Sequence, residues 1–192
     1  GLQHALASKK EELKGKDALA NEKLQQMVED QNEAERKKTD ADKVSRELAR
    51  QNAAIATRRE EVERELAEAE PALLAAQGAV KSIKKAHLDE VRVLVRPPNP
   101  VRLTLEAVLI LLGEEKREWN DVRKVIRRDD FIATVVHFDP ESITAKQVKD
   151  LTDNYLCLDE FDNDAVQRAS TACGPLNKWV VSLLHYSAIL RR

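Results

Sequence analysis

The sequence predicts an all-α protein, in which a long coiled-coil helix leads into a small bundle of about six short helices. Strong helix formers fill the first half, an unbroken seven-residue apolar repeat runs through it, and no strand-like alternation follows the prolines at 97–100. Of the 192 residues, 34% are charged and only 4% are aromatic. That balance is typical of a long solvated helix attached to a modest core.

The apolar repeat predicts that residues 1–96 form one outgoing coiled-coil helix. Steps of seven from Leu6 to Ile83 meet an apolar residue at every position, which indicates a left-handed coiled coil. The helix would extend roughly 115 Å at about 1.5 Å per residue. Pro71 lies inside it and predicts a kink, because proline removes a helical hydrogen bond.

The second line of the predicted seam is weak. At the positions four residues beyond each repeat position, most side chains are polar. The apolar residues suited to knobs-into-holes packing there are Leu24, Leu66, Leu73 and Val80. The first line is rich in alanine, which buries little area, so no single register should dominate strongly. The only apolar pattern that could begin a partner strand is the 4-3-4 spacing of Trp179, Leu183, Tyr186 and Leu190. We therefore expect residues 179–192 to start a returning helix and the chain to be cut from a longer one.

Residues 97–178 predict a helical domain. Asn99 is a good N-cap with Pro100 at the first helical position, and Gly113 should end that helix. Later helices are expected to begin near Trp119, Phe131, Thr144, Asp162 or Asn163, and Gly174. Both tryptophans begin apolar faces and are expected in the core.

Several function classes are excluded by what the sequence lacks. No apolar run approaches the length of a membrane span, the five glycines do not cluster, and the four histidines are scattered. Cys157 and Cys173 are interpreted as buried, reduced thiols. The sequence thus predicts a soluble intracellular chain with no catalytic residues, no metal site and no cofactor. The formal net charge of −2 means that any electrostatic partner must meet a local patch.

Several stretches carry a family resemblance: Ala79-Val80-Lys81-Ser82-Ile83-Lys84-Lys85 with Pro97-Pro98, Trp119 through Asp130-Phe131-Ile132, and Ala172-Cys173-Gly174-Pro175-Leu176 with Lys178-Trp179. In their order and spacing they resemble the stalk and microtubule-binding domain of dynein heavy chains, and residues 21–35 resemble the outgoing stalk helix. The match covers essentially the whole chain.

The resemblance implies a function. This chain would be the tip and one stalk strand of a microtubule motor, binding α/β-tubulin electrostatically. Sliding of the stalk register would switch its affinity and couple it to a distant AAA+ ATPase ring. The implied division is an outgoing stalk helix, 1–96, a microtubule-binding domain, 97–178, and the start of the returning strand of the same heavy chain, 179–192. The implied location is cytoplasmic and cytoskeletal, and the sequence leaves an axonemal heavy chain open.

Site residues follow from the same resemblance. It implies that tubulin is contacted by six basic residues: Lys84, Lys85, Arg102, Arg128, Arg168 and Lys178. It also implies that Glu106 and Asp164 restrain binding as acidic partners, although Asp stands where the family commonly has Glu at 164.

Two other functions are alternatives to the microtubule-binding interpretation. A structural coiled-coil adaptor with a helical protein-binding head would share the architecture, and microtubule cosedimentation would separate the two. A nucleic-acid-binding helical arm would need a dense basic surface interleaved with aromatics, which the domain lacks. We therefore expect neither nucleic acid nor membrane as partner.

Overall fold

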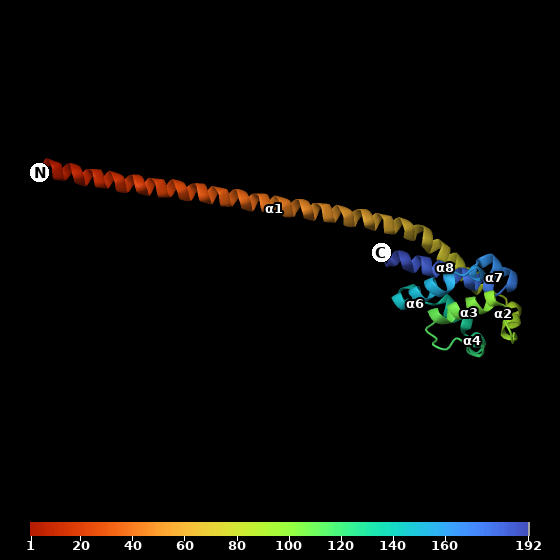
Figure 1. The fold of residues 1–192 in the computed structure, drawn as a ribbon. Helices are drawn as coiled ribbons and strands as arrows, with labels where there is room; N and C mark the ends of the chain where they lie inside the picture. The colour runs from red at the N-terminus through yellow and green to blue at the C-terminus, as the bar shows by residue number, and fades with distance from the viewer. Residues whose placement is uncertain (192) are drawn as a thin grey trace. The chain divides into compact units, whose positions relative to one another are not determined.

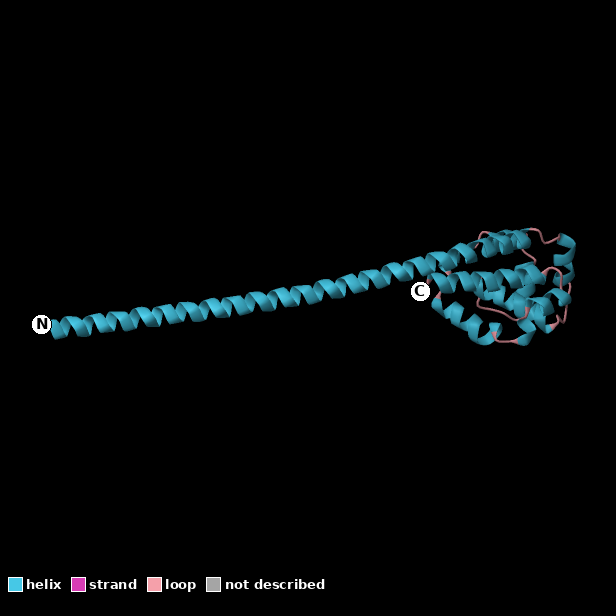
Figure 2. Cartoon of the chain, turned by 90° about the horizontal axis from the view of Figure 1, so that it is seen from above, coloured by secondary structure: helices cyan, strands magenta, loops and turns pink. Residues whose placement is uncertain are grey.

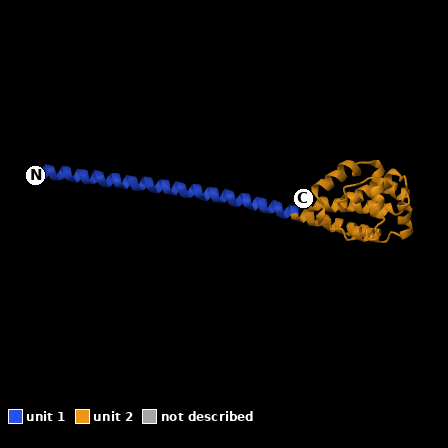
Figure 3. Ribbon diagram, turned by 90° about the horizontal axis from the view of Figure 1, so that it is seen from below, with its two compact units in different colours: residues 1–58 blue, residues 59–192 orange. Residues whose placement is uncertain are grey.

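The computed structural model describes residues 1–191, and two compact units divide the chain: unit 1, residues 1–58, and unit 2, residues 59–192 (Figure 3). Throughout the described residues the chain forms helices joined by loops, with no strand (Figure 2). This confirms the predicted all-α class.

Helix α1, Leu2–Lys81, is one continuous helix that begins in unit 1 and ends in unit 2. Every residue of unit 1 is exposed, including the large apolar members of the repeat such as Leu13 and Ile55. Pro71 lies inside the helix, which remains assigned as helical on both sides of it.

The first helix is shorter than the sequence indicates, because it stops at Lys81 and a separate helix α2 covers Lys85–Arg92. At the break, the Ser82 hydroxyl and backbone N–H both donate to the carbonyl of Gly78, at 2.9 and 3.1 Å. The backbone of Lys84 is extended, which lets the half-buried Ile83 pack against the core. No proline or glycine marks this break, so the helical pattern concealed it.

In its described residues, unit 2 contains the end of α1, seven further α-helices and three short turns. The longer elements are α3 (Asn99–Leu111), α4 (Trp119–Ile126), α5 (Phe131–Val136), α6 (Ala145–Leu151), α7 (Asn163–Ala169) and α8 (Cys173–Leu190), in addition to α2. The short turns are η1 (Pro140–Ser142), the π-helical turn η2 (Thr152–Leu156) and η3 (Asp159–Phe161). These helices begin close to the predicted starts.

Local capping explains most helix ends. Gly113 has φ +82° and follows α3, with Gly113 N–H bonded to Ile110 O and Glu114 N–H to Leu109 O. This is the paired pattern that closes a helix on a left-handed glycine. Thr144 and Gln147 form a reciprocal capping box on α6. The prediction for Asn99 was wrong by one position, because Pro98 precedes the helix and Asn99 is its first residue.

The core is centred on α3 and α8, which pack against each other and against α7 (Figure 1). Leu105 and Leu109 of α3 and Leu176, Trp179 and Leu183 of α8 are fully buried. Trp179 stacks edge-on with Phe138 at 5.8 Å, which confirms its core placement. Trp119 is only half-buried, packs against the core and donates its indole N–H to Leu94 O at 2.7 Å.

A buried polar side chain ties four elements together. Asn177 of α8 is fully buried and donates to Phe161 O of η3 at 3.0 Å, while Asn163 of α7 donates to its side-chain oxygen at 3.2 Å. Its amide also lies 3.5 Å from the Thr104 hydroxyl of α3. A Cβ at the neighbouring Gly174 would lie 1.7 Å from the Gln167 side chain, so glycine permits the close approach of α7 and α8.

The predicted seam is covered where α1 passes α8. Figures 1 and 2 show α8 beside the last turns of α1 and running in the opposite direction. Leu73, Ala76 and Val80 belong to the same buried cluster as Leu183 and Leu184. Ala69 and Ala76 of the first predicted line and Leu73 and Val80 of the second are therefore buried in unit 2.

Candidate functional site

The six basic residues singled out by sequence come from five places in unit 2. Lys84 caps α2 and Lys85 is its first residue, while Arg102 lies in the second turn of α3. The others lie between α4 and α5, in the last turn of α7 and in the second turn of α8: Arg128, Arg168 and Lys178. Their neighbours differ enough to divide them into two groups.

Four of these cations have no counter-charge within the described part of the chain. Lys84, Lys85, Arg168 and Lys178 are exposed, and none forms an ion pair within 4 Å with any residue between 1 and 191. Such side chains keep their full charge for an external partner. A lysine or arginine that does not have to leave a carboxylate binds an anionic surface without that added cost.

The other two cations are held by glutamates. Arg102 Nη1 lies 2.9 Å from Glu106 Oε1, one turn along α3, and Arg128 Nη1 lies 3.1 Å from Glu114 Oε1. The Glu106 side chain is only 14% exposed, whereas Arg102 is 40% exposed. The pair joins a basic and an acidic residue that the sequence singled out. Glu114 was not singled out from the sequence, because it lies 14 residues from Arg128.

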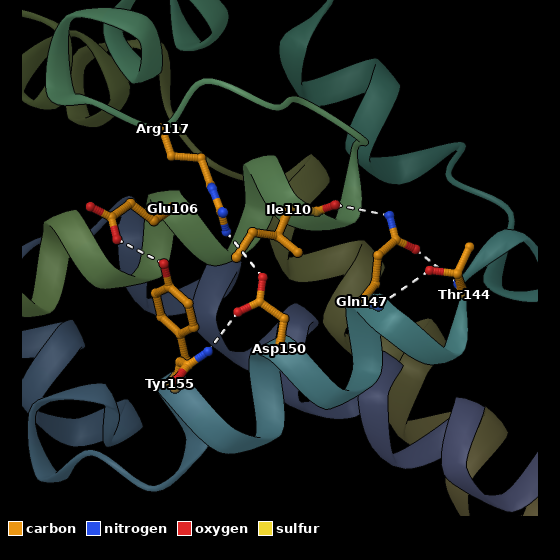
Figure 4. Close-up of polar contacts among 8 residues, drawn as sticks. Glu106, Ile110, Arg117, Thr144, Gln147, Asp150 and Tyr155 are labelled. Carbon is orange, nitrogen blue, oxygen red and sulfur yellow. Dashed lines mark hydrogen bonds and ion pairs between the residues drawn. The ribbon is translucent and has the colours of Figure 1, made fainter.

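Glu106 has a second partner that the sequence did not reveal. Tyr155 of η2 donates its hydroxyl to Glu106 Oε2 at 2.9 Å (Figure 4). Burial, followed by the hydrogen bond and the negative charge of Glu106, raises the pKa of Tyr155 to about 12. The hydroxyl therefore stays protonated and donates to the carboxylate at any ordinary pH. Tyr155 was not among the residues singled out by sequence.

The segment that carries Tyr155 is hydrogen-bonded to α3 and to the loop that follows α3. Gln147, while completing the α6 cap, donates its amide to Ile110 O of α3 at 2.9 Å. Asp150 accepts from Arg117 at 3.1 Å and from Asn154 at 2.8 Å. Figure 4 shows these contacts along one side of α6 and η2. The π-helical turn then places Tyr155, like Leu151, in buried surroundings.

An arginine cluster joins α2 to α4. Arg92 Nε donates to Ile126 O at 2.7 Å, near the end of α4, while Arg123 Nε and Arg127 Nη2 each lie 3.4 Å from Arg92 O at the end of α2. Each helix thus supplies cations to the C-terminal carbonyls of the other, where the helix dipole favours positive charge. The cluster fixes α2, with Lys84 and Lys85 at its start, against the helix that precedes Arg128.

Asp164 stands apart from the paired cations. It lies in the first turn of α7, is exposed, and forms no ion pair among the described residues. Its position near a helix N-terminus is electrostatically favourable by itself. The structure therefore brings only Arg102 and Glu106 together among the eight candidate residues.

The thiols differ from the prediction in one respect. Cys173 is buried, and burial raises its pKa to about 11. Cys157 is exposed, so the prediction that it is buried was wrong. It follows the π-helical turn, where its thiol lies 3.0 Å from Asp153 O. A helical pattern cannot reveal such a turn, which shifts the phase of the exposed and buried positions.

Residues 1–191 contain neither a metal site nor a membrane-spanning helix. No group of three or more His, Cys, Asp or Glu side chains is arranged to hold a metal ion. No helix in the same range combines the length and apolar character needed to cross a membrane.

Comparisons with known families and relatives agree over almost the whole chain. A family model described as the microtubule-binding stalk of dynein motor matches residues 1–190. The cytoplasmic dynein heavy chain of Dictyostelium discoideum is 44% identical over 192 residues, covering 100% of this chain and 4% of the relative. That of Drosophila melanogaster is 42% identical with the same coverage, and that of Saccharomyces cerevisiae is 37% identical over 98% of this chain and 5% of the relative.

A solved structure supports the fold. One titled the microtubule binding domain of dynein-C matches with a TM-score of 0.61 and 27% identity, covering 68% of this chain and 92% of that one. The chain spans only about one twentieth of the length of the curated relatives, 4% to 5%.

Proposed function

The chain belongs to the dynein family as a microtubule-binding stalk domain, and we propose that unit 2 holds the microtubule by basic side chains that meet acidic tubulin. The observation that carries this proposal is a group of four exposed cations that form no ion pair with any of residues 1–191: Lys84, Lys85, Arg168 and Lys178. Arg102 and Arg128 would join them after release from their glutamates.

The paired cations suggest how affinity is restrained. Arg102 binds tubulin only to the extent that it leaves Glu106, so the pair lowers affinity without blocking the surface. The same reasoning applies to Arg128 and Glu114, which are more exposed and so are held less tightly. For Asp164 the restraint would act on the partner directly, by placing a negative charge among the contacts.

The stalk coiled coil would carry the signal that switches affinity. Its returning strand comes from the same heavy chain, and sliding of the two strands would couple unit 2 to a distant AAA+ ATPase ring. Two observations favour this. The seam is rich in alanine and polar residues, and α8 already lies antiparallel to α1 along the buried part of the seam. The chain itself would then be the non-catalytic track-binding part of a cytoplasmic, microtubule-associated motor, as its relatives' names suggest.

Microtubule cosedimentation over a range of salt concentrations tests the electrostatic contact. Screening over about 8–10 Å near physiological salt should weaken binding steeply as salt rises. Lys84→Ala should lower affinity several-fold, on the order expected of a rim charge, and should slightly reduce the salt dependence of the binding that remains. Lys146→Ala is the matched control, because Lys146 is also exposed but lies on α6, outside the proposed contacts.

Two results would count against the proposal. An affinity independent of salt would exclude a mainly electrostatic contact. A wild-type chain that does not pellet with microtubules at low salt would favour a coiled-coil adaptor with a helical head.

A further inference from the structure

We propose that Tyr155 is a positioning residue: its hydroxyl holds the Glu106 carboxylate on Arg102 and thereby keeps Arg102 from tubulin. This inference rests on the proposed function, since it concerns how one of the proposed contact residues is restrained. It adds a residue from a different helical segment, 49 positions away from Glu106 in the chain.

The geometry gives each carboxylate oxygen one partner. Glu106 Oε1 accepts from Arg102 at 2.9 Å and Glu106 Oε2 accepts from Tyr155 at 2.9 Å. The two donors differ in origin, because Arg102 shares α3 with Glu106 whereas Tyr155 reaches across from η2 (Figure 4). The carboxylate therefore lies between a partly exposed guanidinium and a buried phenol.

Loss of the hydroxyl would leave one oxygen without a donor in a largely buried place. A buried acceptor that loses its hydrogen bond is costly, and more so when it is charged. Since the Glu106 side chain is 14% exposed, its carboxylate can recover hydrogen bonds by turning toward water. That movement draws Oε1 away from Arg102, and the guanidinium becomes available to an acidic surface.

Tyr155 can act as a fixed point because its own place is determined by several contacts. The residue is 8% exposed, and its ring packs edge-on against Phe161 at 6.2 Å. The preceding helix is bound to α3 through Gln147 and to the loop after α3 through Asp150 and Arg117. Any shift of α6 and η2 along α3 would consequently change the Arg102–Glu106 pair.

Cosedimentation with microtubules at low salt tests the inference with Tyr155→Phe, which removes the hydroxyl and keeps the ring. We expect affinity to rise about threefold, part of the rise produced by Glu106→Gln. Tyr186→Phe is the matched control and should bind as the wild type does, because Tyr186 packs against the core from α8. Thermal melting of each variant checks that unit 2 remains folded.

The double variant Tyr155→Phe/Glu106→Gln distinguishes positioning from a general loosening of the fold. If Tyr155 acts through Glu106, the double variant should bind no more tightly than Glu106→Gln alone. Additive increases would overturn the inference, because they would mean that the hydroxyl acts elsewhere. Wild-type affinity in a folded Tyr155→Phe would overturn it as well.

Glu106→Asp changes the carboxylate of these contacts instead of the phenol. It tests the inference if Tyr155→Phe does not fold. The shorter side chain keeps the charge but cannot reach Arg102 and Tyr155 together. Raised affinity supports the inference, and unchanged affinity overturns it. Wild-type binding that depends on salt, measured in the same series, separates failure of this inference from failure of the proposed tubulin contact.

Discussion

Residues of one seven-residue repeat meet different surroundings in the two units. Leu13 and Ile55 in unit 1 are 60% and 58% exposed, whereas Ala69 and Ala76 in unit 2 are 4% and 3% exposed. The larger apolar side chains are the exposed ones. Burial in this chain is therefore decided by whether another helix covers the seam, and the buried residues of α1 lie in its last turns, beside α8.

This contrast has an energetic meaning. Most helical stability in proteins comes from packing of an apolar face and not from helix propensity. In unit 2 that packing includes a fully buried tryptophan and the two central helices, while unit 1 relies on propensity and on exposed ion pairs such as Lys37–Glu33. The two units should thus respond very differently to the same substitution.

The largest expected difference comes from a matched pair of leucines. Leu183→Ala should lower the free energy of unfolding of unit 2 by about 2–5 kcal/mol, because Leu183 is fully buried. Leu13→Ala should change stability by less than about 0.5 kcal/mol, since its side chain is exposed and alanine favours helix. Tryptophan fluorescence reports the melting, because Trp119 and Trp179 both lie in unit 2.

Far-UV circular dichroism of the same samples follows the helices of both units, so a change that tryptophan fluorescence does not share reports on unit 1. An equal loss in both variants would break the contrast, because it would mean that the seam of unit 1 is covered in solution. Sedimentation velocity would then show self-association of the wild-type chain.

Alkaline pH should weaken unit 2 through Cys173. Burial raises the pKa of this thiol from 9.0 to about 11, so its neutral form is favoured in the folded state. The resulting stability is fully present below pH 9 and is lost as pH rises toward about 11, by roughly 2–3 kcal/mol. Denaturant unfolding followed by tryptophan fluorescence measures the loss.

Cys173→Ala should flatten this pH dependence, although it lowers stability at neutral pH. Cys157→Ala is the control, because Cys157 is exposed and its removal should leave the slope unchanged. An identical slope in wild type and Cys173→Ala would rule out the buried thiol as its source.

Much of the fold follows from local chemistry that the sequence displays. The repeat predicted the helix of unit 1, and the glycine at 113 and the threonine at 144 predicted a helix end and a helix start that the structure confirms. The glycine and the threonine each act on the backbone within a few residues of their own position. The break at Ser82 and the π-helical turn at Thr152–Leu156 carry no such signal, since tertiary packing selects them.

The candidate site was predictable only in part. A family resemblance selected Arg102 and Glu106, and their spacing of four on one helix is compatible with the observed pair. Tyr155 could not be found in this way, because its partner lies on another element 49 residues away. The sequence did not predict the arginine cluster between α2 and α4 for the same reason, since the cluster depends on how two short helices pack together.

Covering the seam of unit 1 should change the behaviour of unit 2. We expect that restoring the returning strand, and locking it by disulfides in two registers about half a heptad apart, gives microtubule affinities that differ by tenfold or more. This needs only about 1.4 kcal/mol of differential binding. Packed helices switch between discrete arrangements, so a slip near Val80 should move α3 and, with it, Arg102. Cys157→Ser prevents mispairing, and equal affinities in both locked forms would mean that the stalk carries no signal to unit 2.

The smallest effect is expected from an ion pair of unit 1. Arg50 Nη2 lies 2.6 Å from Glu47 Oε1, and this hydrogen-bonded pair lowers the pKa of Glu47. A lowered pKa contributes stability above the ordinary carboxyl value of 4.5 and loses it as pH falls through the lowered value. Both side chains are at least half exposed, so solvent screens the pair and the contribution should be undetectable in melting.

Arg50→Ala should therefore leave the far-UV melting curve unchanged, while the carboxyl carbon of Glu47, followed by NMR, titrates at a higher pH than in the wild type. High salt should erase that difference. A fall in the melting temperature of unit 1 would show that its helix depends on individual ion pairs, and the contrast with the packed helices of unit 2 would lose its basis.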